Sequence, residues 1–331
     1  MNKQNRKIIF DTRWFGEHGI GRFSKEVYDE NIFKPIKLRG NPVSIFDVFK
    51  LTLYLLFHRD FFYSPGFNAP LFFLNRTAIT LHDLNHVDLD ANSSFLKRLY
   101  YNLILKRACR KCAFIVTVSE FSKNRIIDWS GVNSDKIKVI YNGVSEAFHP
   151  NVKAYEPGFP YIFIVGNRKL HKNEDRALRA FAQANIDKKI KLLLSGNPSE
   201  QLINTAKECN IEDHIIFLGR LSEDQLASLY KGAICLLFPS LYEGFGLPVI
   251  EANACGIPVI TSNIGALKEI TEENFNTLVN PKSIIEIKEA IENLTNKKSF
   301  NNNAYIKNHL RNFNWILAKK QIKELTLSKF R

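Results

Sequence analysis

The sequence lacks any long apolar run. Its most apolar stretch, Leu51–Phe57, is bounded by Lys50 and His58, whereas a membrane-spanning helix needs about 20 apolar residues in succession. The N-terminus, MNKQNRKIIFD, reaches Asp11 before the apolar region of a signal peptide can develop. We therefore expect a protein without a transmembrane helix that stays in the cytoplasm, where it is made.

Cysteine is also scarce, with 5 in 331 residues, which excludes a small secreted domain held together by disulfides. Cys109 and Cys112 form a single Cys-x-x-Cys pair, and no second pair exists to complete a zinc site. We favour a structural role for all five thiols over a redox or metal role. The 45% apolar fraction excludes disorder, and the length suggests two domains that each bury a core.

Acidic residues are too few to balance the basic ones. Asp and Glu number 33 against 46 Lys and Arg, which gives a net charge of +13. Residues 1–150 contribute 22 basic and 14 acidic residues, hence +8, and residues 151–331 contribute the remaining 24 and 19, hence +5. Such an excess predicts an anionic partner: nucleic acid, an acidic membrane face or a phosphorylated substrate.

The most basic segment, Ala91–Ser119, has no acidic residue at all. Its apolar residues recur at helical spacing: Phe95, Leu96, Leu99, Tyr100, Leu103 and Ile104. Its basic residues are Lys97, Arg98, Lys106, Arg107, Arg110 and Lys111. Two interpretations stay open, namely a helix that lies on an anionic membrane and a helix whose apolar side faces the core and whose polar side is basic.

The chain is expected to form an α/β fold of two domains. Pro and Gly residues between His149 and Pro160 mark the boundary, so we predict domains at 1–150 and 157–312 and a C-terminal helix, 313–331, that returns to the first domain. Short β-branched runs alternate with helical patterns, which is typical of parallel sheets. The predicted strands are Lys7–Asp11, Phe61–Tyr63, Ala78–Leu81, Phe114–Val118, Lys138–Ile140, Tyr161–Val165, Lys191–Ser195, Ile215–Leu218, Ile234–Phe238 and Pro258–Thr261.

Polar residues gather after these strands, where open parallel sheets bind ligands. A loop with two glycines follows Ile234–Phe238 and precedes a helix predicted to begin near Leu247. Free N–H groups at a helix start can bind phosphate, and Glu243 and Glu251 would bracket it. The alternative, a glycine pair with two solvated glutamates, carries equal weight on this segment alone.

Two cations follow the strand Tyr161–Val165. Arg168 and Lys172 suit a diphosphate, since each can neutralise a departing oxygen. Taken alone they are better explained as surface charge. Opposite a phosphate-binding helix start, the diphosphate becomes the favoured interpretation.

Two further segments come from the first half of the chain. Gly16, Gly19 and Gly21 predict a flexible loop, not a nicotinamide site, because the third glycine of the dinucleotide pattern is missing. His82 and Asp83 follow the strand Ala78–Leu81, so His82 can meet a sugar hydroxyl or serve as a capping or core histidine.

Taken together, these motifs resemble glycosyltransferase family 4. The resemblance rests on EGFGLPVIEA from Glu243, VGNRKLHKN from Val165, TVSEFSK (Thr117–Lys123), YNGV (Tyr141–Val144) and IIFLGRLS (Ile215–Ser222), in that family's order and spacing from Ile9 to Trp315. It implies a GT-B fold, two Rossmann-like doubly wound domains facing across a cleft. The implied enzyme is a retaining, metal-independent hexosyltransferase that uses a nucleotide-diphosphate sugar.

The resemblance also implies roles for residues. Arg168 and Lys172 would hold the diphosphate, although His171 stands where the family often has arginine, which makes Arg168 the weaker assignment. Glu243 would bind sugar hydroxyls and Glu251 the ribose. The other implied donor contacts are Gly19, Gly21, Arg220, Leu221, Gly244, Phe245, Gly246 and Leu247; His82 would face the transferred sugar, and Arg22, Asp83, Ser119 and Asn142 would lie toward the acceptor.

The predicted reaction moves a hexose to a hydroxyl of a lipid-linked or polysaccharide acceptor, with a lean toward GDP-mannose and toward bacterial O-antigen or capsule synthesis. Charge on the leaving diphosphate would be met by cations and a helix start, which covers the role of a metal, and the sequence contains no Asp-x-Asp motif. A sugar-nucleotide epimerase or glycan phosphorylase on the same scaffold is the alternative. A nucleic-acid-binding protein is disfavoured, because no aromatic-basic stripe or recognition helix is found. The basic excess at Lys97–Lys111 is then interpreted as a peripheral contact with the inner face of the plasma membrane.

Overall fold

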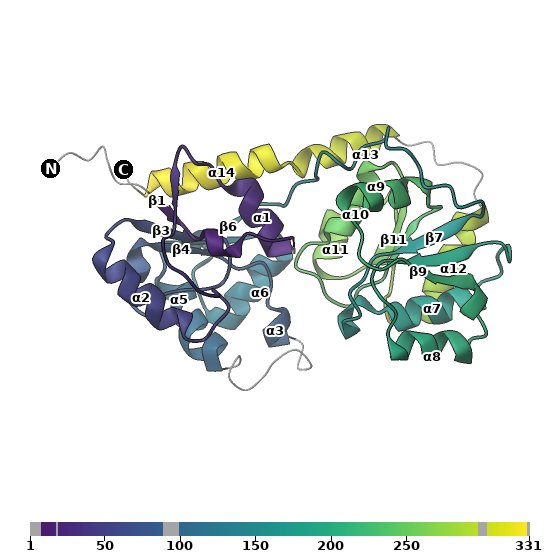
Figure 1. Ribbon diagram of the computed structural model, residues 1–331, viewed down its shortest axis with the longest axis horizontal. Helices are drawn as coiled ribbons and strands as arrows, with labels where there is room; N and C mark the ends of the chain where they lie inside the picture. The colour runs from purple at the N-terminus through teal and green to yellow at the C-terminus, as the bar shows by residue number, and fades with distance from the viewer. Residues whose placement is uncertain (1–7, 18, 89–98, 297–302, 330–331) are drawn as a thin grey trace. The chain divides into compact units, whose positions relative to one another are not determined.

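The chain folds into two compact units, shown in the computed structural model of Figure 1. Residues 8–17, 19–88, 99–296 and 303–329 are described by the structure. Unit 1 comprises Met1–Gly143 and Asn314–Arg331, and unit 2 comprises Val144–Phe313.

The predicted boundary at residue 150 is therefore placed too late. A Cβ on Gly143 would lie 2.3 Å from the backbone nitrogen of Trp315, so the chain up to Gly143 packs closely within unit 1. The Pro-rich segment that follows belongs to unit 2, because Tyr155 N donates to Ser228 O at 2.9 Å and Ser228 Oγ donates to Lys153 O at 2.8 Å. Proline and glycine mark where the chain is irregular, and here that stretch runs along the second core.

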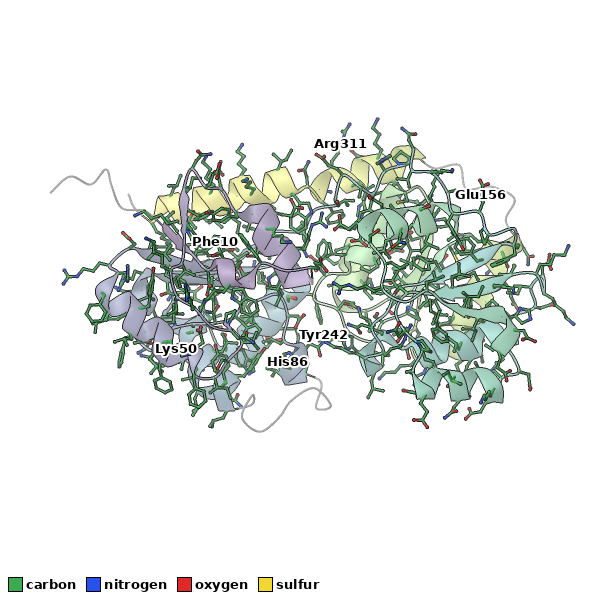
Figure 2. All side chains as sticks on the ribbon, viewed as in Figure 1. Phe10, Lys50, His86, Glu156, Tyr242 and Arg311 are labelled. Carbon is green, nitrogen blue, oxygen red and sulfur yellow. The ribbon has the colours of Figure 1, made fainter. Side chains whose placement is uncertain are left out.

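Unit 1 is built on six parallel strands in the order β2-β1-β3-β4-β5-β6. They are β1 (Ile8–Phe10), β2 (Phe33–Pro35), β3 (Phe61–Ser64), β4 (Thr77–Thr80), β5 (Phe114–Thr117) and β6 (Ile137–Val139). Every residue of the four inner strands, β1, β3, β4 and β5, is buried, which follows from helices covering both faces. Figure 2 shows the contrast between Phe10, inside this core, and the exposed Lys50 on helix α2.

The helices of unit 1 are α1 (Gly19–Val27), α2 (Asp47–Phe57), α3 (Asn85–Asp88), a π-helical turn (Tyr100–Leu105) continuous with α5 (Lys106–Lys111), α6 (Glu120–Ser130) and α14 (Trp315–Ser328). Helix α6 has clear sequence signals at both ends. Ser119 Oγ accepts from Ser122 N at 3.0 Å, and Gly131 ends the helix at a φ of 68°.

Unit 2 repeats the pattern with the order β12-β11-β10-β7-β8-β9, again all parallel. Its strands are β7 (Tyr161–Ile164), β8 (Lys191–Leu194), β9 (Ile215–Phe217), β10 (Leu236–Phe238), β11 (Val259–Ser262) and β12 (Thr277–Val279). Its helices are α7 (Glu174–Gln183), α8 (Glu200–Glu208), α9 (Glu223–Gly232), α10 (Leu247–Ala254), α11 (Gly265–Ile270), α12 (Ile284–Asn296) and α13 (Asn303–His309).

The strand order reverses between β1 and β3 in unit 1 and between β7 and β10 in unit 2. All ten predicted strands form, with ends displaced by one or two residues. The two strands that were not predicted, β2 and β12, are three-residue edge strands, and β2 ends in Pro35. An edge strand pairs on one side only, so β2 tolerates Pro35, and its sequence Phe-Lys-Pro has no β-branched residue that would indicate a strand.

The C-terminal helix α14 belongs to unit 1. The Phe23 and Trp315 rings meet edge to face at 6.3 Å, and Lys323 Nζ lies 3.9 Å from Asp29 Oδ2. No helix among the described residues combines the length and apolarity that crossing a bilayer requires.

The basic segment is helical from Leu99 to Lys111, and of its predicted apolar side Tyr100 packs against the core. Leu99 and Leu103 are exposed, whereas Tyr101 and Leu105 face the core. The π-helical turn at Tyr100–Leu105 changes the register, which the assumed helical period did not include. Residues 89–98, with Lys97 and Arg98, lie outside the described residues.

Candidate active site

The strongest candidate site lies in unit 2, where the strand order reverses between β7 and β10. In open α/β sheets ligands bind beyond the carboxyl ends of the strands at such a point. A hydrogen bond joins the loop after β7 to the loop after β10, since Leu241 N donates to His171 O at 2.7 Å. Lys172 Nζ lies 2.6 Å from Glu243 Oε1, and each side chain is 14% exposed. The structure thus brings together two residues that the sequence had predicted for one site.

Asn173 anchors this arrangement, and it was not among the predicted site residues. Its side-chain nitrogen donates to Pro239 O at 2.9 Å and to Pro281 O at 2.7 Å, so one buried amide links the loops after β7, β10 and β12. Its φ of 59° lies in the left-handed region, which asparagine tolerates better than most residues. The Lys-Asn pair ahead of a helix was the available signal.

Arg168 has a different environment from Lys172. Its guanidinium forms an ion pair with Glu174, donates to Ser195 O at 2.5 Å and to Asn197 O at 2.7 Å, and lies 5.3 Å from the centre of the Phe217 ring. The side chain therefore ties the loop after β7 to the end of β8. Most of its hydrogen-bonding capacity is used within the protein.

Glu174, the first residue of α7, is buried next to Arg168. Burial raises the pKa of this carboxyl above its ordinary value of 4.5, and the charge and hydrogen bonds of Arg168 oppose the rise. Gly166 makes room for it, because a Cβ there would lie 2.0 Å from Glu174 Oε1. The glycine after β7 is thus required by an ion pair under the loop.

The glycine loop ends in helix α10 as predicted. Gly246 precedes the helix at a φ of 115°, and a Cβ there would meet Leu267 Cδ2 at 2.6 Å, so both conformation and space favour glycine. Pro248 stands in the first turn, and no side chain caps the helix. Phe245 is buried with its ring 5.7 Å from that of Phe313. Pro248 has no N–H and Val249 N donates to Gly246 O at 3.0 Å, so an anion at this helix start would meet the Leu247 N–H and the positive end of the helix dipole.

Glu251 lies on the second turn of α10. Its Oε2 accepts a hydrogen bond of 3.1 Å from the hydroxyl of Tyr230, which is fully buried on α9. Burial, together with the nearby carboxylate, raises the pKa of the Tyr230 hydroxyl well above its ordinary value, so it remains a donor. Tyr230 therefore orients Glu251, a contact that the sequence did not predict.

A pocket of about 460 Å³ adjoins Arg168 at the carboxyl ends of β7, β8 and β9. Gly196 N donates to Gly219 O at 2.6 Å across it, and both glycines have positive φ. Arg220 and Leu221, predicted to lie near the nucleotide base, line it. With main chain on several sides, this pocket suits a flat polar ring.

In unit 1, the glycines after β1 are placed differently from the prediction of a flexible loop. Gly19 and Gly21 form the first turn of α1. A Cβ on Gly21 would lie 2.6 Å from Gly16 N, so the loop packs directly on the helix. Arg22 forms an ion pair with Glu26 one turn later, at 2.9 Å.

The other predicted residues of unit 1 lie beyond the ends of β4, β5 and β6. His82 Nε2 lies 3.0 Å from Pro65 O, with its ring edge-on to Phe23 at 4.9 Å. Asp83 Oδ1 accepts from Asn85 N at 2.9 Å. Ser119 caps α6 as described above. Asn142 is buried, and its Oδ1 has no hydrogen-bond partner among the described residues.

A buried charge network after β1 escaped the sequence analysis. Arg13 contacts Asp11 at 2.7 Å and Asp47 at 2.6 Å, and Asn68 donates to both carboxylates at 2.9 and 3.1 Å. Burial lowers the pKa of Arg13, but the hydrogen bonds and charges of the two carboxylates outweigh it and raise the pKa. The network fixes the loop after β1 against α2 and β3. No pattern in the sequence indicated it, because Arg13 and Asp47 are 34 residues apart.

These features define a class of protein: two doubly wound units, the second with a cation–carboxylate pair, a free helix start and a pocket for a flat ring. Known structures share the whole fold. Sucrose-phosphate synthase from Thermosynechococcus elongatus matches with a TM-score of 0.79 at 19% identity, over 98% of this chain and 99% of that one. WaaG, a glycosyltransferase involved in lipopolysaccharide biosynthesis, matches with a TM-score of 0.73 at 15% identity, over 96% and 99%. The fold is GT-B.

The chain belongs to the glycosyltransferases of group 1 and family 4. The family described as Glycosyl transferases group 1 matches residues 146–311, and Glycosyltransferase Family 4 matches residues 19–148. The similarity predicted from the five motifs is thereby confirmed.

Two curated relatives are similar in sequence. The O-antigen chain mannosyltransferase RfbU of Salmonella typhimurium is 31% identical over 223 residues, which is 67% of this chain and 61% of the relative. O-antigen chain mannosyltransferase B of Escherichia coli is 28% identical over 228 residues, 64% of this chain and 60% of the relative. The matched regions thus span about three fifths of the length of these relatives.

Proposed function

We propose that the protein is a retaining glycosyltransferase that moves a hexose from a nucleotide-diphosphate sugar to a hydroxyl of a lipid-linked or polysaccharide acceptor. The observation that carries this proposal is the ion pair between Lys172 and Glu243 beside the uncapped start of α10. A cation and the positive end of a helix suit a diphosphate, and a carboxylate suits sugar hydroxyls. Both lie at the strand reversal, where ligands bind in such sheets.

In this proposal each part of the donor has its own contact. Lys172 and the α10 start hold the diphosphate, with Arg168 as a further donor-binding residue. Glu243 accepts from sugar hydroxyls, and Glu251, held by Tyr230, accepts from the ribose. The base enters the pocket at Arg220 and Leu221, and the loop of Gly244, Phe245, Gly246 and Leu247 packs against sugar and phosphate. We also assign residues of unit 1 to the two substrates. Those assigned to donor binding are Gly19, Gly21 and His82, and those assigned to acceptor binding are Arg22, Asp83, Ser119 and Asn142.

The chemistry follows from these contacts. As the glycosyl–oxygen bond breaks, negative charge grows on the diphosphate, where Lys172 and the positive end of α10 stabilise it. The acceptor hydroxyl attacks the same face of the sugar from which the diphosphate leaves, and a phosphate oxygen takes its proton. We propose that no metal ion is required, because the cation and the helix start supply the positive charge.

For the donor we propose GDP-mannose, and for the process bacterial surface-polysaccharide synthesis, O-antigen or capsule. The support is the similarity to two O-antigen chain mannosyltransferases and to an MMP alpha-(1->4)-mannosyltransferase of Mycolicibacterium hassiacum, 30% identical over 202 residues. We further propose that the enzyme works in the cytoplasm at the inner face of the plasma membrane, with the region Lys97–Lys111 toward the anionic lipids.

The experiment is a thermal-shift screen of the full chain against GDP, UDP, dTDP and their sugar conjugates. A ligand present at 100 times its Kd stabilises the folded protein by about 2.7 kcal/mol, so the correct nucleotide raises Tm clearly above the others. We expect GDP and GDP-mannose to do so, and Lys172→Ala to abolish the shift while Lys169→Ala, an exposed neighbour, keeps it.

No shift with any nucleotide would contradict the proposed function. Net epimerised product from the donor alone would indicate an epimerase, and dependence on inorganic phosphate a phosphorylase. Covalently trapped glycosyl-enzyme would contradict same-face attack.

A further inference from the structure

Helix α2 of unit 1 is apolar on two opposite sides. Its inner side carries the buried residues Val48, Leu51 and Leu55, which are three or four positions apart. Its outer side carries five large apolar residues that are 55–75% exposed, and they also recur at helical spacing: Phe46, Phe49, Leu53, Leu56 and Phe57. A surface helix normally turns polar residues outward. An exposed apolar stripe of this size marks an interaction surface.

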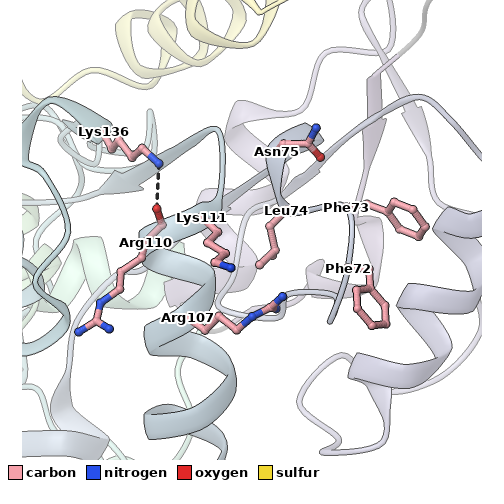
Figure 3. Close-up of a pocket in the computed structure, with 8 residues that line it drawn as sticks. All are labelled: Phe72, Phe73, Leu74, Asn75, Arg107, Arg110, Lys111 and Lys136. Atoms are coloured by element: carbon pink, nitrogen blue, oxygen red, sulfur yellow. Dashed lines mark hydrogen bonds between the residues drawn. The ribbon is translucent and has the colours of Figure 1, made fainter.

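The apolar surface continues beyond α2 toward α5. Leu71 connects the two helices, because its N–H donates to Thr52 Oγ1 of α2 at 2.8 Å and its carbonyl accepts from Arg107 of α5 at 2.5 Å. The next residue, Phe72, is 61% exposed. Phe72 thus follows a residue that is hydrogen-bonded to both helices, and Figure 3 shows its side chain beside that of Arg107.

A pocket of about 420 Å³ lies on the α5 side of Phe72 (Figure 3). Four cations line it, Arg107, Arg110, Lys111 and Lys136, and no acidic residue does. Arg110 donates to Ser130 O at 2.5 Å and Lys136 to Arg110 O at 2.8 Å, contacts that orient the side chains without neutralising them. Within the described part of the chain, none of the four forms an ion pair with a carboxylate.

This pocket is separate from the candidate active site. Its residues precede strands: Phe72–Asn75 come before β4, Arg107–Lys111 before β5 and Lys136 before β6. In a parallel sheet the residues before the strands lie at the amino edge, opposite the carboxyl edge where His82 follows β4. The four cations therefore have no part in holding a donor at the strand ends.

We propose that the outer side of α2, Phe72 and the four-cation pocket form one surface that docks on an anionic phospholipid bilayer, with lipid phosphates in the pocket and the α2 side chains among the acyl chains. An interfacial helix buries an apolar side while cations attract acidic lipids, and this surface has both. The proposal deepens, and rests on, the proposed transfer to a lipid-linked acceptor. It moves the main contact from the segment Lys97–Lys111 as a whole to α2 and the cations of the pocket.

The test is co-sedimentation of the full chain with phosphatidylcholine vesicles and with vesicles that also contain phosphatidylglycerol. We expect binding to the acidic vesicles only. Arg110→Glu with Lys111→Glu should weaken it by about tenfold or more, since each cation near the surface contributes about 1 kcal/mol. Phe49→Ser with Phe57→Ser should weaken it similarly, because the apolar area is lost. Lys111→Glu alone serves if the double charge variant does not fold.

The matched controls change exposed residues of the same kinds elsewhere. Lys188→Glu with Lys189→Glu alters the net charge equally in unit 2, and Ile285→Ser with Ile316→Ser removes exposed apolar side chains from α12 and α14. Both should bind vesicles as wild type does. Equal binding of all variants would overturn the proposal.

Three other outcomes would also overturn it. The first is release from vesicles by millimolar inorganic phosphate alone, which indicates a site for free phosphate. The second is tighter binding of duplex DNA than of acidic vesicles, abolished by the charge variants, and the third is a dimer that Phe49→Ser with Phe57→Ser dissociates while vesicle binding is absent. Vesicle binding does not require turnover. Binding of GDP-mannose without binding of vesicles would therefore contradict this inference alone. Binding of vesicles without binding of any nucleotide would contradict the proposed function.

Discussion

Lys172 and Glu243 stand 71 residues apart in sequence, and their side chains meet at 2.6 Å between Nζ and Oε1. Lys172 Nζ also lies 4.9 Å from the centre of the Phe238 ring, at the end of β10. Each member of the pair neutralises the other while no donor is bound. Under the proposed function, a diphosphate would compete with Glu243 for the ammonium group and leave the carboxylate to accept from sugar hydroxyls.

The pair predicts two different variant phenotypes. Lys172→Ala should weaken nucleoside-diphosphate binding and reduce kcat/KM by about a hundredfold or more, since a group that stabilises transition-state charge is lost. Glu243→Ala should also abolish transfer but should not weaken diphosphate binding, because Lys172 is then unpaired. Calorimetric titration and initial rates measure both, with Lys169→Ala as control. Wild-type turnover in either variant would refute the assignment.

Asn173 should matter for stability. Asn173→Ala removes the donor of two buried carbonyls, each of which costs about 1–3 kcal/mol when left unsatisfied. We expect a loss of about 2–4 kcal/mol in the free energy of unfolding of unit 2. Asn173→Gly, which tolerates the positive φ, should lose somewhat less. Urea denaturation measures the change, and Asn185→Ala, at an exposed position, should lie near wild type. A loss under about 0.5 kcal/mol for Asn173→Ala would contradict the anchoring role.

Arg168 and Glu174 predict a pH dependence. Arg168→Gln removes the charge that opposes the burial of Glu174, so the pKa of Glu174 in the folded protein rises further above 4.5. The folded state then binds the proton more tightly than the unfolded state does. The variant therefore keeps its stability at pH values below the pKa that Glu174 has in the unfolded chain. It loses stability as the pH rises through the higher pKa that Glu174 has in the folded protein.

Unfolding free energies measured from acidic to neutral pH should show this divergence between Arg168→Gln and wild type. Arg176→Gln, in the same first turn of α7, serves as control. A constant difference across the range would mean that Arg168 does not hold the charge of Glu174.

The buried network after β1 predicts a destabilised variant with a rescue. Arg13→Gln leaves Asp11 and Asp47 buried without a cation, which costs about 3–5 kcal/mol. Arg13→Gln combined with Asp47→Asn removes one of the two charges and should recover part of the loss. Thermal unfolding measures both, beside the exposed control Arg39→Gln. No recovery in the double variant would show that the loss comes from packing, not charge.

Chelators should leave the transfer rate unchanged. Lys172 and the start of α10 are proposed to supply the positive charge that a divalent ion supplies in other transferases. Initial rates with and without excess EDTA, after dialysis, measure this, and re-addition of magnesium or manganese is the control. Loss of activity that either ion restores would refute metal independence.

Much of the site could be predicted because strand ends in a parallel sheet share one edge. Arg168, Lys172, Glu243 and Glu251 were identified because each follows a strand or opens a helix. Arg220 and Leu221 were implied by the family resemblance, and both line the pocket beside β9. Tyr230 was missed because nothing local distinguishes a buried tyrosine whose hydroxyl reaches Glu251. Asn173 follows Lys172 ahead of a helix, but its partners Pro239 and Pro281 are distant in sequence, so its anchoring role could not be predicted.

The sequence by itself determined the alternation of strands and helices, and with it two parallel sheets, because the period of apolar residues sets which elements form. It also determined the family, through motifs whose glycines and charged residues keep their spacing.

Only the tertiary structure decided which distant residues meet: Lys172 with Glu243, and Arg13 with Asp11 and Asp47. It also decided that the apolar outer side of α2 has no covering element in the part of the chain described here. The reason is physical. Local pattern fixes the backbone of each element, whereas burial and pairing depend on what the rest of the chain brings against it.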